Sequence, residues 1–323
     1  MRLGVLDVGS NTVHLLVVDA HRGGHPTPMS STKAPLRLAE AIDGDGKLTR
    51  KGAEKLIATV DEFAKIAASS GCADVMAFAT SAVRDARNSD DVLARVRAET
   101  GVELKVLSGV DESRLTFLAV RRWYGWSKGR ITDLDIGGGS LELSSGVDEE
   151  PDVALSLPLG AGRLTREWLS GDPPSRRRIA MLRDWLETEL ADAGKVMLEV
   201  GRPDLAVGTS KTFRSLARLT GAAPSAAGPR VKRVLTANGL RQLIAFISRM
   251  TTEDRAEVEG VSAERAPQIV AGALVAEASM RALSLESVQI CPWALREGII
   301  LRRLDSEADG TALVQTRLRG EAR

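Results

Sequence analysis

The sequence has few of the residues that build metal clusters, disulfide frameworks or histidine-based catalytic sites. Only two cysteines, Cys72 and Cys291, are present, far apart in the chain, and the three histidines are His14, His21 and His25. Two distant cysteines are typical of a protein from a reducing compartment, so we expect a cytoplasmic location. A zinc site or a Ser-His-Asp triad would have to draw on this small pool, which disfavours both.

Aromatic residues, long apolar runs and net charge are also scarce. Aromatics make up 3% of the chain, and the formal net charge is +1. The longest apolar stretch, residues 269–276, is too short to span a membrane, and Asp7 interrupts the apolar N-terminal run that a signal peptide needs. Without a strong overall charge, neither nucleic acid nor membrane is expected as a partner. Basic residues cluster locally at 176–178 and 230–233, a pattern more typical of a solvated surface.

What the chain does contain is a regular alternation of apolar strands and amphipathic helices. Residues 3–7, 75–79 and 131–136 have the pattern of buried strands, and residues 49–69 have helical periodicity. This predicts an α/β fold with mixed sheets, and the length of 323 residues suggests two domains. We predict an N-terminal domain of residues 1–127, joined by a C-terminal helix at about 296–312, and a second domain of residues 128–295.

One pattern occurs twice: an apolar strand ending in an acid, a glycine turn, a hydroxyl residue and a second apolar strand. The first glycine turn follows Asp7 and consists of Gly9, Ser10, Asn11 and Thr12. The second glycine turn follows Asp135 and consists of Gly137, Gly138, Gly139 and Ser140. The repetition suggests two similar domains, each offering a turn to a shared cleft.

Glycine turns of this kind suit phosphate, because they expose backbone N–H groups and permit positive φ and close approach of an anion. An acid beside a bound phosphate is repulsive unless a cation lies between them. Mg²⁺, with Mn²⁺ as an alternative, fits this role because it takes oxygen ligands. The competing interpretation is that both segments are ordinary hairpins in which the aspartate accepts hydrogen bonds from the N–H groups of the turn.

A third turn, Gly208, Thr209 and Ser210, leads from a strand into a helix and adds a helix N-terminus that attracts anions.

With these residues assembled, the chain resembles the exopolyphosphatase and guanosine pentaphosphate phosphohydrolase family. That family belongs to the actin-like superfamily, with ribonuclease H-like domains flanking a central cleft. The resemblance covers about residues 3–303. Besides the three glycine turns, it is carried by four segments: residues 36–41 (LRLAEA), 79–84 (ATSAVR), 108–115 (SGVDESRL) and 294–298 (ALREG).

The resemblance implies a role for each matched residue. Glu112 matches the catalytic acid, which would deprotonate the attacking water, and Arg84 matches a phosphate-contacting arginine. Asp135 and Glu142 match the metal-linked acids, with Asp7 as a further candidate. The three glycine turns supply the other phosphate contacts. The implied activity is Mg²⁺-dependent hydrolysis of the terminal phosphate of inorganic polyphosphate by a homodimer.

Several positions depart from the family pattern. Leu141 replaces a usual threonine, Ala39 and Ala41 replace glycines, and Lys211 replaces a small residue. These changes bear on substrate preference more than on reaction class. The chain stops where longer relatives continue into further helical domains, so we expect no C-terminal HD-type domain and a preference for short polyphosphate.

Three alternatives stay open at this point. Guanosine pentaphosphate is the rival substrate, although the scarcity of aromatics favours a plain polyanion. A kinase or ATPase could use the same fold and the third turn for ATP. A non-catalytic sensor of polyphosphate or alarmone would explain the missing threonine at Leu141, but the presence of Glu112, Asp135 and Glu142 argues against it.

Overall fold

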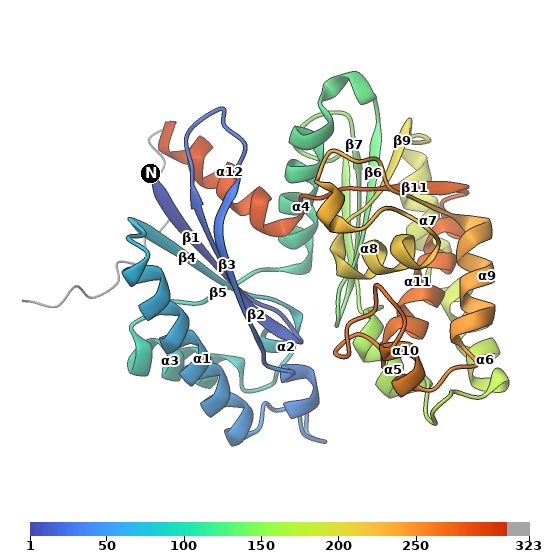
Figure 1. Ribbon diagram of the computed structural model, residues 1–323, viewed down its shortest axis with the longest axis horizontal. Helices are drawn as coiled ribbons and strands as arrows, with labels where there is room; N and C mark the ends of the chain where they lie inside the picture. Colours follow the sequence, from blue (N-terminus) through green and yellow to red (C-terminus); the bar gives the residue numbers. More distant parts are fainter. Residues whose placement is uncertain (309–323) are drawn as a thin grey trace, which may run out of the picture. The chain divides into compact units, whose positions relative to one another are not determined.

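The computed structural model describes residues 1–308 and divides into two compact units (Figure 1). Unit 1 comprises Met1–Leu115 and the chain from Leu295, and unit 2 comprises Thr116–Ala294. The boundary falls within helix α4 (Gly109–Tyr124), and helix α12 (Leu295–Ala308) belongs to unit 1. Of the C-terminal helix predicted over about residues 296–312, residues 309–312 lie outside the described part.

Unit 1 contains a five-stranded mixed sheet with strand order β3-β2-β1-β4-β5. The strands are β1 (Arg2–Val8), β2 (Thr12–Asp19), β3 (Pro28–Pro35), β4 (Asp74–Ala79) and β5 (Lys105–Val106). Neighbours among the first three strands are antiparallel, whereas β4 is parallel to both β1 and β5. Since β1 lies at the centre, its end is a well-supported position for a functional turn.

Both faces of this sheet are covered by helices. Leu6 and Val8 pack in one apolar cluster with α1 (Arg50–Ser69) and α3 (Ser89–Thr100). Leu3 and Val5 pack in another with Ile300 of α12. Because successive side chains of a strand point to opposite faces, this central strand reads as a continuous apolar run rather than an alternating one.

Unit 2 contains a six-stranded mixed sheet with strand order β10-β11-β9-β6-β7-β8. The strands are β6 (Ile131–Ile136), β7 (Leu141–Gly146), β8 (Val153–Leu157), β9 (Leu205–Gly208), β10 (Val234–Thr236) and β11 (Ser287–Ile290). The pairs β6–β7 and β7–β8 are antiparallel, and β9 is parallel to β6 and β11. These pairings repeat the β3-β2-β1-β4-β5 order of unit 1.

One apolar helix forms the centre of the helical layer of unit 2. The helices are α5 (Ala161–Trp168), α6 (Arg176–Glu189), α7 (Ala191–Glu199), α8 (Ser210–Leu219), α9 (Ala237–Ile247), α10 (Thr252–Ala256) and α11 (Ile269–Ala282). Helix α11 is buried from Ile269 to Met280 and touches α5 to α9. A helix that is apolar all round requires such a position.

The predicted fold class, α/β with a mixed sheet in each half, is confirmed by these two sheets. Within residues 1–308, no helix combines the length and the apolar character that a membrane span needs.

Candidate functional site

The first glycine turn joins β1 to β2 and is held by bonds from three directions. Gly9 N donates to Thr12 O over 3.0 Å. The amides of Leu36 and Arg37 donate to Asn11 O over 2.8 and 2.9 Å, and Ala39 N donates to Ser10 O over 3.2 Å. At Ala39, where the family has glycine, the supporting contact is therefore made by the backbone.

The reason for glycine at position 9 is space. A Cβ there would lie 3.3 Å from Thr12 O, and Gly9 and Gly137 are absent from the residues with positive φ. The positive φ that glycine permits is therefore not used at either position. A Cβ at Gly9 would therefore crowd the closing carbonyl, whereas at Gly137 the corresponding distance, 3.4 Å to Ser140 O, is an ordinary contact.

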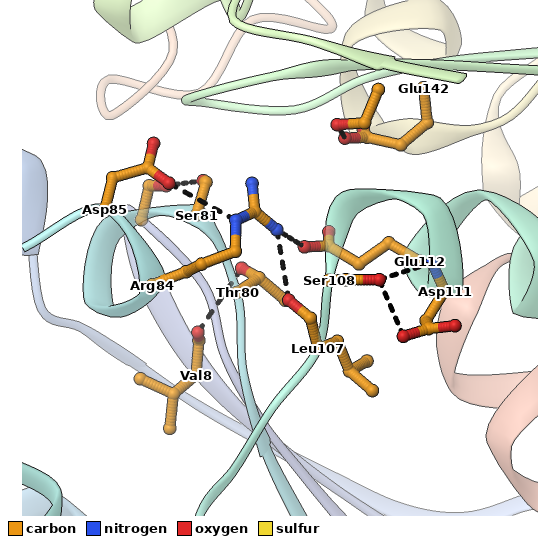
Figure 2. A network of polar contacts seen from close by, with 12 residues as sticks. Val8, Thr80, Ser81, Arg84, Asp85, Leu107, Ser108, Asp111, Glu112 and Glu142 are labelled. Atoms are coloured by element: carbon orange, nitrogen blue, oxygen red, sulfur yellow. Dashed lines mark hydrogen bonds and ion pairs between the residues drawn. The ribbon is translucent and has the colours of Figure 1, made fainter. Parts of the chain in front are cut away.

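Glu112 lies in the first turn of α4 and is buried, so it is not the exposed helix acid that most such residues are (Figure 2). Its Oε1 accepts a hydrogen bond from Arg84 Nη1 over 2.5 Å. Arg84 lies at the end of α2 (Ser81–Arg84) and also donates to Leu107 O and Asp85 Oδ1, both over 3.2 Å. The arrangement is a charge-assisted hydrogen bond between Glu112 and the guanidinium of Arg84.

Helix α2 also connects this pair to the first glycine turn. Ser81 Oγ lies 2.9 Å from Ser10 Oγ, and Arg84 is one turn further along the same short helix. Ser81 was not among the predicted site residues, although it lies in the segment 79–84 that carries the family resemblance. Unit 1 thus brings together the turn, the arginine and the acid.

Asp7 precedes the first glycine turn and is paired with a cation from the end of the chain. Arg296 Nη1 donates to Asp7 Oδ2 over 3.3 Å. Burial raises the pKa of Asp7, and Arg296 acts in the opposite direction. Because this carboxylate already has a guanidinium partner, Asp7 is a weaker metal candidate than an acid without one.

The second glycine turn joins β6 to β7 with the same closing bond, from Gly137 N to Ser140 O over 2.9 Å. Helix α5 begins directly against it. Ala161 N donates to Gly137 O over 3.0 Å, and Arg163 N donates to Gly138 O over 2.9 Å. The start of α5 is therefore fixed to the turn by its own amides.

Two predicted metal-linked acids face each other across the β6–β7 hairpin. Asp135 pairs in register with Glu142, and Glu142 Oε1 accepts a hydrogen bond from Ser156 over 2.9 Å. Asp133 lies two residues before Asp135 on the same face of β6, and its buried Oδ1 has no hydrogen-bond partner. Acids placed opposite each other repel, so a cation at this face would stabilise the hairpin.

Burial has the largest effect on the pKa of both Asp135 and Asp133. It raises the pKa of Asp135, against an opposing hydrogen bond from Thr209, whose Oγ1 lies 2.7 Å from Asp135 Oδ2. Burial also raises the pKa of Asp133 well above the usual range, and the charge of Asp135 adds to the effect.

Among residues 1–308, no group of three or more histidine, cysteine or acidic side chains has a metal-binding arrangement. Two carboxylates are nevertheless enough for Mg²⁺, which keeps several waters.

The third turn joins β9 to α8 and carries a strained backbone. Ser210 has φ 50°, a left-handed value that is uncommon for a residue other than glycine. Thr212 Oγ1 donates to Ile136 O over 2.9 Å and accepts from Arg265 Nη1 over 3.1 Å. Strain of this kind clusters at functional sites. The third turn is thereby connected to the strand that leads into the second glycine turn.

Three cations accompany the third turn: Lys211, Arg214 and Arg265. Burial lowers the pKa of Arg265 to about 10, with a further contribution from Arg214, and Asp135 opposes this shift. Lys211 Nζ lies 3.3 Å from Ser262 Oγ, so it reaches across to the loop before α11.

Leu141, which departs from the family's usual threonine, is fully buried in the apolar core, so its side chain packs inward.

The two basic clusters noted in the sequence differ in their contacts. Arg233 donates to the carbonyls of Ala223, Pro224, Gly228 and Val231 and so holds the loop before β10. Arg176, Arg177 and Arg178 are exposed at the start of α6. The cluster at 230–233 therefore has a structural role at Arg233, whereas the cluster at 176–178 is exposed at the surface.

Comparison with known proteins gives one consistent result. A family model described as "Ppx/GppA phosphatase family" matches residues 17–307. A protein named Exopolyphosphatase 1 from Mycobacterium tuberculosis (strain ATCC 25618 / H37Rv) is 82% identical over 316 residues, which cover 98% of this chain and 92% of the relative. The Mycobacterium leprae protein of the same name is 81% identical over 319 residues, covering 99% and 94% of the two chains.

Solved structures agree with this result. The crystal structure of the Aquifex aeolicus Ppx/GppA family member has a TM-score of 0.80 at 25% identity and covers 95% of this chain and 98% of its own. An exopolyphosphatase from Cytophaga hutchinsonii has a TM-score of 0.85 at 24% identity, with coverage of 97% and 99%, and shows the same fold.

Proposed function

Because the chain belongs to the Ppx/GppA phosphatase family, we propose that it is an exopolyphosphatase, which hydrolyses the terminal phosphate of inorganic polyphosphate. The family resemblance and the actin-like fold predicted from the sequence are thereby confirmed. The high identity to proteins named Exopolyphosphatase 1 supports a phosphoanhydride hydrolase. It does not favour the kinase, ATPase or sensor alternatives.

The single structural observation that carries the proposal is the repeated glycine turn. Each unit ends a central strand with an acid and then closes the turn by the same bond, 3.0 Å long at Gly9 and 2.9 Å long at Gly137. Backbone amides in such turns bind anions through fixed dipoles. A linear polyanion presents repeated identical groups, which suits repeated anion-binding turns.

Glu112 acts as the general base in this proposal. It accepts the proton of a water whose oxygen forms the new bond to the terminal phosphorus, while the bridging P–O bond breaks and the shortened chain leaves. Arg84, whose Nη1 lies 2.5 Å from Glu112 Oε1, pairs with this carboxylate and has further N–H donors to offer a phosphate. Phosphoryl transfer depends mainly on positioning and charge stabilisation, so a base, a divalent cation and the turn amides suffice.

Asp135 and Glu142 are the proposed ligands of a divalent cation, Mg²⁺ before Mn²⁺, with Asp7 as a further candidate. Their cross-strand pairing and the raised pKa of buried Asp135 fit a site that is stabilised by a cation. When bound, the ion supplies neutralisation of phosphate charge. Thr209 orients Asp135, and Ser156 orients Glu142.

A substrate panel tests this function. Phosphate release is measured from tripolyphosphate, long-chain polyphosphate, guanosine pentaphosphate and ATP, each with and without Mg²⁺. We expect Mg²⁺-dependent release from both polyphosphates at a higher kcat/KM than from guanosine pentaphosphate. Equal or faster turnover of the nucleotide would make guanosine pentaphosphate the preferred substrate, and phosphate transfer from ATP to a second molecule would indicate a kinase.

A homodimer and a cytoplasmic location complete the proposal. The cytoplasmic location is supported by Cys72 and Cys291, neither of which forms a disulfide. Light scattering after size-exclusion chromatography tests the dimer, for which a mass of twice 34.5 kDa is expected.

A further inference from the structure

Residues Arg176–Arg178 take no part in the site described above. They form the start of α6, and Arg178 contacts Trp168 O at the end of α5, a helix that begins at the second glycine turn. We infer that an arginine ridge, formed by Arg163 and Arg166 of α5 and by Arg176, Arg177 and Arg178 of α6, binds the phosphates of a polyphosphate chain beyond its reacting end. The inference rests on the proposed function and adds to it the path that a longer substrate follows on unit 2.

The ridge begins at the second glycine turn. Arg163 N donates to Gly138 O over 2.9 Å, so the first arginine of α5 is anchored to the turn itself. Gly160 lies so close to the turn that a Cβ on it would be 2.3 Å from the carbonyl carbon of Gly139. The direction of α5 away from the turn is therefore fixed by backbone contacts.

The ridge continues along α5 and into α6. Arg166 follows Arg163 by three residues, a spacing that places both on one face of the helix. Arg178 Nη1 then donates to Trp168 O, the last residue of α5, over 3.2 Å. Stacking of Trp168 on Trp185, with ring centroids 4.8 Å apart, joins α5 to α6. These contacts hold the start of α6 beside the end of α5.

The charge of this segment is unusual for the chain. Residues 161–178 contain five arginines and two acids, while the whole chain has a net charge of +1. One of the acids, Asp172, is already paired with Arg255 over 2.9 Å. The first turn of α6 has no acidic residue, although acids are favoured and cations disfavoured at a helix N-terminus. Arginines placed against the helix dipole point to an anionic ligand.

The two outermost arginines give the sharpest test. In the variant Arg176→Gln/Arg177→Gln, two exposed cations are removed while Arg178 keeps its bond to Trp168 O. The matched control is Arg230→Gln/Lys232→Gln, which removes the same charge from exposed residues of the same unit. Steady-state hydrolysis of long-chain polyphosphate and of tripolyphosphate is measured for each protein over a range of salt concentrations.

We expect the ridge variant to lower kcat/KM for long chains, relative to tripolyphosphate, by about three- to tenfold, as the loss of two exposed charge pairs implies. The salt dependence of the long-chain reaction should also become shallower, because fewer counterions are released on binding. The control variant should match wild type in both respects. The thermal midpoint of the ridge variant should not fall, because the removed charges oppose the helix dipole.

Two results would overturn the inference: an unchanged ratio of long-chain to tripolyphosphate kcat/KM in the ridge variant, or an equal change in the control. If wild type hydrolyses neither polyphosphate, the proposed function fails instead, so the two failures are distinguishable. The same assay decides the preference for short chains that the sequence suggested.

Discussion

Replacing Gly160 with alanine would disturb the second glycine turn without removing any polar group. A Cβ at this position would lie 2.3 Å from Gly139 C and 2.4 Å from both Gly139 N and Ser140 N. All three atoms belong to backbone rather than to a movable side chain, so the turn or the start of α5 must shift by about 1 Å to restore ordinary contact. The amides proposed to hold phosphate are among the displaced atoms.

The expected effect on activity is larger than the effect on stability. Overpacking of this kind costs about 1–3 kcal/mol, and a misplacement of about 1 Å at a reacting centre can reduce catalysis about 100-fold. For a unit of this size, such a cost lowers the melting temperature by about 2–12 °C. Phosphate release from tripolyphosphate and a thermal melt, both in Mg²⁺, measure the two effects.

Gly44→Ala is the matched control, because a Cβ there would have no atom within 4 Å and the backbone is not left-handed. It should resemble wild type in both measurements. Full activity of Gly160→Ala would refute the claim that the turn amides must keep their positions. Loss of activity caused only by unfolding would appear as a melting transition below the assay temperature.

Two further predictions concern buried charges. The raised pKa of Asp133 means that the folded state holds this proton more strongly than the unfolded state, so its ionisation removes stability as pH rises above the usual range of aspartate. In thermal melts without metal, the melting temperature of Asp133→Asn relative to that of wild type should rise as pH increases. A difference in melting temperature that stays constant with pH would contradict this. Arg303 Nε lies 3.1 Å from Asp74 Oδ2 and both residues are buried, so Arg303→Ala should cost about 3–5 kcal/mol in urea unfolding. Arg50→Ala, which breaks only the exposed pair with Glu54, should cost less than about 0.5 kcal/mol, and equal losses would contradict the argument.

The fold was predictable where apolar periodicity was strong. Helix α1 begins and ends within one residue of its prediction, because Thr49 caps it and its apolar face is continuous. Strand β3 was missed because it is largely exposed and polar, so it lacks an alternating pattern. Helices α6 and α7 are separate and meet at Leu190, although no glycine or proline lies at their junction. Such interruptions depend on tertiary packing rather than on local composition.

The site was predictable where residues belong to the repeated strand–turn–strand pattern, because hairpin geometry places them without further information. Asp135 and Glu142 face each other for this reason. The partners that come from distant segments were not predictable in the same way. Arg296 reaches Asp7 from α12, and Thr209 reaches Asp135 from the third turn, which follows β9. Only the three-dimensional pairing of strands and helices brings such residues together.

The proposal depends most on Glu112, and its isosteric replacement by glutamine tests it most directly. Single-turnover release of phosphate from tripolyphosphate in Mg²⁺ is compared for wild type, Glu112→Gln and Asp111→Asn. Asp111 is the adjacent acid and bonds only locally, accepting from Ser108 Oγ over 2.6 Å, so it serves as the control. Loss of a general base should slow the Glu112→Gln reaction at least about 100-fold while substrate binding persists, and Asp111→Asn should remain near wild type. A Glu112→Gln protein that released phosphate at the wild-type rate would contradict the proposed mechanism.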